Sequence, residues 1–178
     1  HSIDTFQWLM GNPTSVQASL ARQHRAIECE TAAALSMRFE DGGVGTVTAT
    51  TATRGGVDRI DINGAHGSAG LQRDTIDYVD IAPPDVDSAD DETRPRTIDH
   101  PESLEYGQPH RLVVEDFLES IRADRPPAVS GREARTAVDI ILAAYASDER
   151  GTLIEVEDVR RGEISEANSG DDIESRSD

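Results

Sequence analysis

The sequence predicts an α+β fold in which an open, mostly antiparallel sheet has helices packed on one face. Three observations predict it. Alternating apolar residues mark strands through the first half of the chain, a turn at Glu40-Asp41-Gly42-Gly43 joins two of them as a hairpin, and two amphipathic helical segments follow. Strands followed by a helix pair are typical of α+β proteins rather than of alternating α/β proteins.

The first half of the chain begins with a helix and continues as strands. Residues 2–10 place apolar side chains on one helical face, and Gly11 ends the helix. We expect Gly67 and Gly70 to bracket a tight turn between the last strands. Strands are predicted at residues 15–23, 31–39, 44–53, 60–62 and 76–81.

The second half is predicted to be helical. Its elements are a long acidic loop at 83–108, a helix at 110–124, a helix from Ser130 to Gly151 and a strand at 153–156. The second helix starts with a capping box, in which Ser130 and Glu133 satisfy each other's backbone N–H groups. Residues 157–178 are acidic with almost no apolar side chains, so we expect a disordered tail after a domain of residues 1–156.

Composition excludes several functions. The chain has 178 residues, and 35 acidic residues outnumber 17 basic residues, all of them arginine, for a net charge of −18. Without lysine, this chain alone cannot form a P-loop or a Schiff base with a carbonyl. The acidity argues against nucleic acid or an anionic membrane as partner, because like charges repel. No apolar run approaches the roughly 20 residues that span a bilayer.

The charge also suggests an environment. Complete absence of lysine beside an excess of short carboxylates indicates adaptation to a salty cytoplasm. We therefore expect a cytoplasmic protein of a halophile, the alternative being an ordinary acidic protein. Unfolding as salt is withdrawn is the expected result, and a melting temperature indifferent to salt would contradict it. The single cysteine, Cys29, excludes a disulfide within the chain and gives no sign of an oxidising compartment.

Neither the glycines nor the histidines predict a cofactor or metal site. Gly43-Val44-Gly45 lacks the third glycine of a dinucleotide fingerprint, and residues 64–70 have the wrong spacing, so both are interpreted as turns. The acids between Asp85 and Asp91 do not fit the EF-hand pattern. The histidines show no metal-ligand spacing. We expect no cofactor-binding and no metal-binding residue in this chain.

One pair of side chains could catalyse proton transfer. Residues three apart share a helical face, so Asp4 can hydrogen-bond His1 and orient its imidazole. A histidine oriented by a carboxylate is a good proton shuttle. The same pair at a helix start is more often a cap, and no Ser or Cys nucleophile motif accompanies it. The spacing alone therefore leaves both interpretations open.

The order of several motifs resembles one enzyme family. Residues 1–11, HSIDTFQWLMG, are similar to the H-x-x-D-x-x-x-x-L-x-G segment of the Gfo/Idh/MocA oxidoreductases, the family of glucose–fructose oxidoreductase and inositol dehydrogenase. The hairpin at 40–46, the I-x-G-x-x-G-like turn at 60–67 and the segment at 125–134 follow in the family's order. The resemblance covers nearly all of residues 1–156.

The resemblance implies that residues 1–156 are the C-terminal domain of such an enzyme, which supplies substrate contacts and forms homo-oligomers through its sheet face. It implies hydride transfer between NAD or NADP and a sugar, polyol or related alcohol. His1 would then relay the proton of the substrate hydroxyl, with Asp4 orienting it. The family's N-terminal Rossmann domain, with its E-K-P lysine and nucleotide glycines, is absent from this chain. We therefore expect the chain alone to bind no cofactor and to be inactive.

Three hypotheses follow. The chain is the substrate-side part of an NAD(P)-dependent dehydrogenase, a stand-alone noncatalytic module that binds a ligand or oligomerises, or a decayed gene remnant. The coding sequence upstream of His1 separates the first two, because a Rossmann fingerprint with E-K-P favours the dehydrogenase and an independent start codon favours the module. A remnant would give no cooperative melt in high salt.

Overall fold

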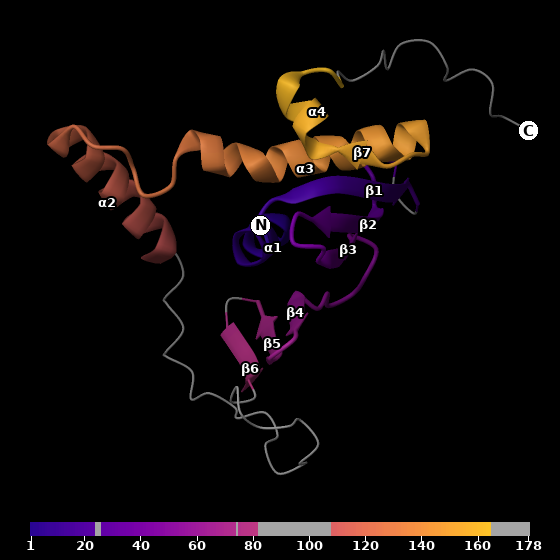
Figure 1. Ribbon diagram of the computed structural model, residues 1–178, viewed down its shortest axis with the longest axis horizontal. Helices are drawn as coiled ribbons and strands as arrows, with labels where there is room; N and C mark the ends of the chain where they lie inside the picture. The colour runs from indigo at the N-terminus through magenta and orange to yellow at the C-terminus, as the bar shows by residue number, and fades with distance from the viewer. Residues whose placement is uncertain (24–25, 74, 82–107, 165–178) are drawn as a thin grey trace, which may run out of the picture. The chain divides into compact units, whose positions relative to one another are not determined.

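The structure, a computed structural model, describes residues 1–23, 26–73, 75–81 and 108–164. These residues divide into two units. The first holds α1, β1–β3, α3, β7 and α4, and the second holds β4–β6 and α2 (Figure 1).

A four-stranded antiparallel sheet forms the centre of the first unit. Its strands are β1 (Pro13–Ala21), β2 (Ala32–Phe39), β3 (Val44–Thr50) and the short β7 (Ile154–Glu155), in the order β3-β2-β1-β7. The predicted hairpin is confirmed. Its turn is closed by the N–H of Phe39 donating to the carbonyl of Gly43 at 3.0 Å, and Gly42 adopts a φ of 86° that favours glycine.

The two faces of this sheet differ in polarity. Val16 of β1 pairs with Met37 of β2, and Met37 pairs with Gly45 of β3, so these side-chain positions share one face. On that face Val16 and Met37 are fully buried. On the opposite face Ser15 is buried. The exposed residues of that face are Gln17, Ser19, Ala34, Ser36, Arg38, Val44, Thr46, Thr48, Thr50 and Glu155. The sheet is therefore open on one side, as predicted.

Helix α3 (Gly131–Arg150) packs along β1 and buries Ile140 and Ala143 (Figure 1). Its last turn also bonds the edge of that strand. The Ser147 hydroxyl accepts the N–H of Ala18 at 2.9 Å and donates to the Thr152 carbonyl at 2.6 Å. The Asp148 carboxylate accepts the N–H of Leu20 at 2.8 Å. Two side chains thus continue the ladder along β1 where β7 ends.

Helix α4 (Val156–Arg161) corrects the expectation that the tail is disordered from residue 157. Val156, the last residue of the predicted strand, and Val159, which lies in the predicted tail, are both buried. Acids in its first turn and arginines in its last turn complement the helix dipole. Residues 165–178, the remainder of the predicted tail, lie outside the described residues.

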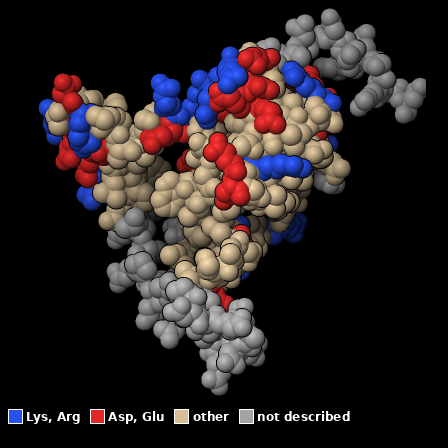
Figure 2. All heavy atoms as spheres, in the orientation of Figure 1, with Lys and Arg blue, Asp and Glu red and all other residues tan. Residues whose placement is uncertain are grey.

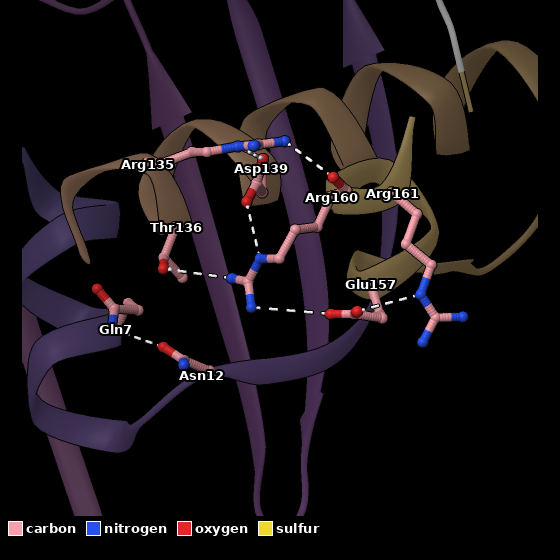
Figure 3. A network of polar contacts seen from close by, with 8 residues as sticks. All are labelled: Gln7, Asn12, Arg135, Thr136, Asp139, Glu157, Arg160 and Arg161. Carbon is pink, nitrogen blue, oxygen red and sulfur yellow. Dashed lines mark hydrogen bonds and ion pairs between the residues drawn. The ribbon is translucent and has the colours of Figure 1, made fainter. Parts of the chain in front are cut away.

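A buried carboxylate joins α4 to α3 (Figure 3). Asp139 of α3 is 1% exposed and accepts from Nε of Arg135 at 3.1 Å and from Nε of Arg160 at 3.2 Å. Arg135 also donates to the carbonyl of Arg160 at 3.0 Å. Glu157 lies on the exposed side, 3.8 Å from Arg160 and 3.2 Å from Arg161. Figure 2 accordingly shows acidic and basic side chains intermixed over this part of the surface.

A three-stranded antiparallel sheet forms part of the second unit, with β4 (Arg59–Gly64), β5 (Gly67–Gln72) and β6 (Thr75–Ile81) in chain order. The predicted tight turn between Gly67 and Gly70 is wrong, because both glycines lie within β5. Gly70 is needed for packing instead. A Cβ at Gly70 would collide with the ring of Tyr78, which lies across β5.

The Tyr78 ring connects the outer strands of this sheet. Its hydroxyl donates to Asp61 at 3.1 Å, and Nε of Arg59 donates to the same carboxylate at 2.7 Å. Arg59 also pairs with Asp77 at 3.1 Å. The hydrogen bond from Arg59 is the main cause that lowers the pKa of Asp61. The network is exposed to solvent and joins β4 to β6.

Helix α2 (Gln108–Ala123) follows the predicted acidic loop, of which residues 83–107 lie outside the described residues. Asp116 stabilises the turn after the helix. Its carboxylate accepts a hydrogen bond from the N–H of Ala128 at 2.7 Å and forms an ion pair with Arg125 at 2.9 Å. The predicted apolar stripe of the helix is exposed rather than buried. It comprises Val113, Val114, Phe117, Leu118 and Ile121.

Candidate functional site

The structure places His1 and Asp4 at the start of helix α1 (Ser2–Met10). His1 is the N-cap residue, and its carbonyl accepts the N–H of Thr5 at 2.9 Å. Asp4 lies in the first turn. Both side chains are exposed, and within the described ranges no hydrogen bond or ion pair joins them. The two residues are thus one helical turn apart, as the spacing predicts, with their side chains open to solvent.

The two faces of α1 differ in their exposure to solvent. Asp4 and Trp8 are four residues apart and share the solvent face, where Trp8 is 78% exposed. Phe6 lies two residues from each of them, on the other side of the helix, and is buried. The helix therefore presents Asp4 and Trp8 outward and attaches to the sheet through Phe6.

The Phe6 ring packs on β2 and β3. It meets the ring of Phe39 edge-to-face, with centroids 6.0 Å apart and planes 68° apart. It also covers the backbone of Gly45, the second residue of β3. These two contacts attach the helix that carries the candidate catalytic pair to the apolar face of the sheet.

The end of α1 is fixed by its connection to β1. Gly11 has a φ of 84°, which stops the helix at a conformation that favours glycine. The side chain of Gln7 donates to Asn12 across this turn at 2.8 Å (Figure 3). Pro13 then starts β1. Two residues, Gly11 and Asn12, thus connect α1 to β1.

Tyr145 and Glu30 form a polar contact that sequence reasoning missed. The Tyr145 hydroxyl on α3 donates to the Glu30 carboxylate, before β2, at 2.7 Å. This hydrogen bond, with burial and the charge of Glu30, raises the pKa of Tyr145 to about 12. Their separation of 115 positions explains why no local pattern predicts the contact.

Other candidate sites do not assemble in the described part of the chain. The glycines at 43–45 and 64–70 lie in antiparallel hairpins, which no helix follows directly. Among the residues that the structure describes, no three His, Cys, Asp or Glu side chains group as metal ligands. No helix in the described ranges is long and apolar enough to cross a membrane.

A family model matches the first part of the chain. The GFO/IDH/MocA C-terminal domain model matches residues 1–70, which include α1 and the predicted His1–Asp4 pair. The matched segment also contains the hairpin of β2 and β3. No curated protein sequence matches the chain.

Solved dehydrogenase structures share the fold. The WlbA dehydrogenase from Bordetella pertussis, in complex with NADH and UDP-GlcNAcA, matches at 24% identity and a TM-score of 0.68, over 87% of this chain and 42% of that one. Levoglucosan dehydrogenase, in complex with NADH and levoglucosan, matches at 23% identity and a TM-score of 0.71, over 86% and 47%. An oxidoreductase from Agrobacterium radiobacter, in complex with NAD+, L-tartaric acid and magnesium, matches at 18% identity and a TM-score of 0.64, over 87% and 46%.

The chain spans less than half the length of each of these three structures. At such identities the likeness establishes the fold and not the activity. The fold of the chain is similar to the folds of these dehydrogenases, and the GFO/IDH/MocA C-terminal domain model matches its first 70 residues.

Proposed function

We propose that this chain is the substrate-side part of an NAD- or NADP-dependent dehydrogenase that transfers hydride between the nicotinamide and a sugar, polyol or related alcohol. The observation that carries the proposal is the match of residues 1–70, with the His1–Asp4 pair, to the C-terminal domain of such enzymes. Similar folds in dehydrogenases solved with NADH and levoglucosan or UDP-GlcNAcA support the substrate class.

In the proposed reaction His1 takes the proton of the substrate hydroxyl during oxidation and returns it during reduction. Asp4, one turn further along α1, orients the imidazole. Exposure of both side chains at the helix start supports this assignment, because a substrate hydroxyl can approach them without rearrangement of the chain.

The described residues do not fit a dinucleotide. Pyrophosphate binding needs a glycine turn that opens a helix, so that backbone N–H groups point at the phosphates. Here Gly43 and Gly45 lie at a β-hairpin, and the Phe6 ring covers Gly45. We therefore assign NAD or NADP to a part of the intact enzyme outside this chain, and expect no binding of NADH by the chain alone in a calorimetric titration.

The experiment starts from the coding sequence upstream of His1. We expect an in-frame nucleotide-binding domain with an E-K-P lysine, and NAD(P)+ reduction by the longer protein on a panel of sugars and polyols that includes levoglucosan. His1→Ala should lower kcat by about 10²–10⁴-fold, the range for loss of a general acid–base group. Unchanged kcat in His1→Ala, or a start codon at this position with no such domain, would refute the proposal.

A homo-oligomer through the open sheet face completes the proposal. Ten side chains on that face are exposed, and two of them are charged, Arg38 and Glu155, with opposite signs. The whole chain, by contrast, has a net charge of −18. Depletion of charge is typical of the centre of protein interfaces. Light scattering of the chain should show a dimer or larger assembly, and Ser36→Asp with Thr48→Glu should return it to a monomer. A wild-type monomer at all salt concentrations would exclude this interface.

The same face favours a second candidate function, a stand-alone module that binds a ligand or oligomerises without catalysis. It differs from the dehydrogenase in one measurement. The module would keep its assembly and any sugar binding in His1→Ala, and its reading frame would contain no nucleotide-binding domain.

A further inference from the structure

Helix α1 is held to the sheet by one buried side chain. All nine residues of α1 are described, and Phe6 alone among them is buried. Its ring occupies the space that a side chain at Gly45 would fill. A Cβ at Gly45 would lie 2.5 Å from Cζ and 2.8 Å from Cε1 of Phe6, and 3.3 Å from the ring of Phe39. No residue larger than glycine fits at this position without moving the Phe6 ring.

Apart from this contact, glycine is an unfavourable residue at position 45, because it lies in a strand. Gly45 is the second residue of β3, a strand whose other residues are valine, threonine and alanine. Glycine weakens a strand interior, because it loses more conformational entropy and packs no side chain. A glycine in such a strand often marks a close approach of another group. Here that group is the aromatic ring of α1.

This anchor determines where the candidate catalytic pair lies. His1 precedes Phe6 by five residues, about 7.5 Å along a helix, and Gly11 follows Phe6 by five residues. The helix turns into β1 at Gly11, so a displaced Phe6 ring tilts α1 about that end. The tilt moves the far end, with His1 and Asp4, farther than it moves Phe6. Small changes at Gly45 are therefore enlarged at the pair.

We propose that Gly45 is a positioning residue that seats Phe6 and thereby fixes His1 and Asp4 relative to the sheet. The inference rests on the proposed function for the role of the pair, but the anchoring itself does not. Gly45 lies in β3, whereas the pair lies at the start of α1. It acts through Phe6 and the rigid helix between them.

The anchoring is tested in the chain as given, by amide hydrogen exchange. In Gly45→Ala, exchange of the amides of residues 6–10 should be at least about tenfold faster than in the wild type, while β2 amides such as Met37 change little. The double variant Gly45→Ala with Phe6→Leu should regain most of the protection, because the smaller side chain leaves room for the added methyl. Gly64→Ala is the matched control, since its Cβ would meet only a carbonyl oxygen at 3.8 Å.

Two results would overturn the anchoring. One is unchanged exchange of residues 6–10 in Gly45→Ala, and the other is a double variant no better protected than Gly45→Ala. If Gly45→Ala does not fold, Phe6→Leu decides, because it removes the ring without adding bulk. Loss of protection confined to α1 then supports the anchor, and equal loss in β2 contradicts it.

The positioning role is tested in the longer dehydrogenase. Gly45→Ala should lower kcat by about 10- to 100-fold, as displacement of a catalytic group by about 1 Å does, with KM nearly unchanged. The double variant should recover kcat, and Gly64→Ala should match the wild type. Full kcat in Gly45→Ala with a mobile α1 would overturn positioning. Full kcat in His1→Ala would instead refute the proposed function and leave the exchange result standing.

Discussion

Replacement of Asp139 by asparagine measures how much the buried charge between α3 and α4 contributes to the free energy of unfolding. Asparagine keeps the shape of the side chain but removes the charge that Arg135 and Arg160 share. Hydrogen bonds to charged groups contribute about 1.5–3 kcal/mol each. The carboxylate is 1% exposed, whereas the two arginine side chains are 54% and 38% exposed and can regain water. We therefore expect Asp139→Asn to lower the free energy of unfolding by about 1.5–3 kcal/mol. This is less than the roughly 3–5 kcal/mol that is lost when a wholly buried ion pair is broken.

Urea unfolding followed by circular dichroism measures this loss as a lower midpoint at constant slope. Glu157→Gln is the control, because Glu157 pairs with the same Arg160 at 3.8 Å but is 52% exposed. An exposed pair of this kind contributes about 0–1 kcal/mol. The reasoning is refuted if Asp139→Asn costs no more than Glu157→Gln, since burial would then have no influence on the strength of the two ion pairs.

Three further changes test other contacts. The hydrogen bond to Glu30 raises the pKa of Tyr145 to about 12. The contribution of this bond to the stability of the fold is therefore complete below the ordinary pKa near 10 and is lost as pH rises through about 12. Glu30→Gln should return the pKa of Tyr145, measured by phenol absorbance, toward 10. Hydrogen bonds from the N–H of Ala128 and from Arg125 lower the pKa of Asp116. The contribution of Asp116 to stability is therefore present above about pH 4 and is lost as pH falls through the lowered pKa. In the wild type the Ala128 amide should exchange faster once Asp116 is protonated, and Asp116→Asn should abolish this pH dependence. Gly70→Ala should displace the Tyr78 ring and cost about 1–3 kcal/mol in a urea melt.

Local patterns predicted the elements whose causes are local. The hairpin of β2 and β3 follows from turn residues at 40–43 and from alternating side chains on either side, all within twenty positions. Helix α4 was missed because Val156 was assigned to the preceding strand and Val159 stands in a segment whose composition is that of a tail. Strand β5 was missed because Gly67 and Gly70 favour a turn locally, and only the Tyr78 ring from the next strand explains the second glycine.

The candidate site divides in the same way. The turn spacing of His1 and Asp4 could be read from the sequence, because it depends on helix geometry alone. The contact between Phe6 and Gly45 could not, since 39 positions separate the two residues and the register of β2 with β3 decides which strand residue lies under the ring. A lone glycine among β-branched residues was the signal in the sequence, and its partner needed the fold.

The two edges of the sheet in the first unit have different capacities for growth. Along β1 the outward N–H groups of Ala18 and Leu20 are already occupied by side chains of α3, so a new strand would have to displace a serine and an aspartate. At the other end β3 is the outermost strand in the described part of the chain. A strand that is added beside β3, from this protein or another, displaces no side chain of α3, whereas one that is added along Ala18 and Leu20 of β1 does.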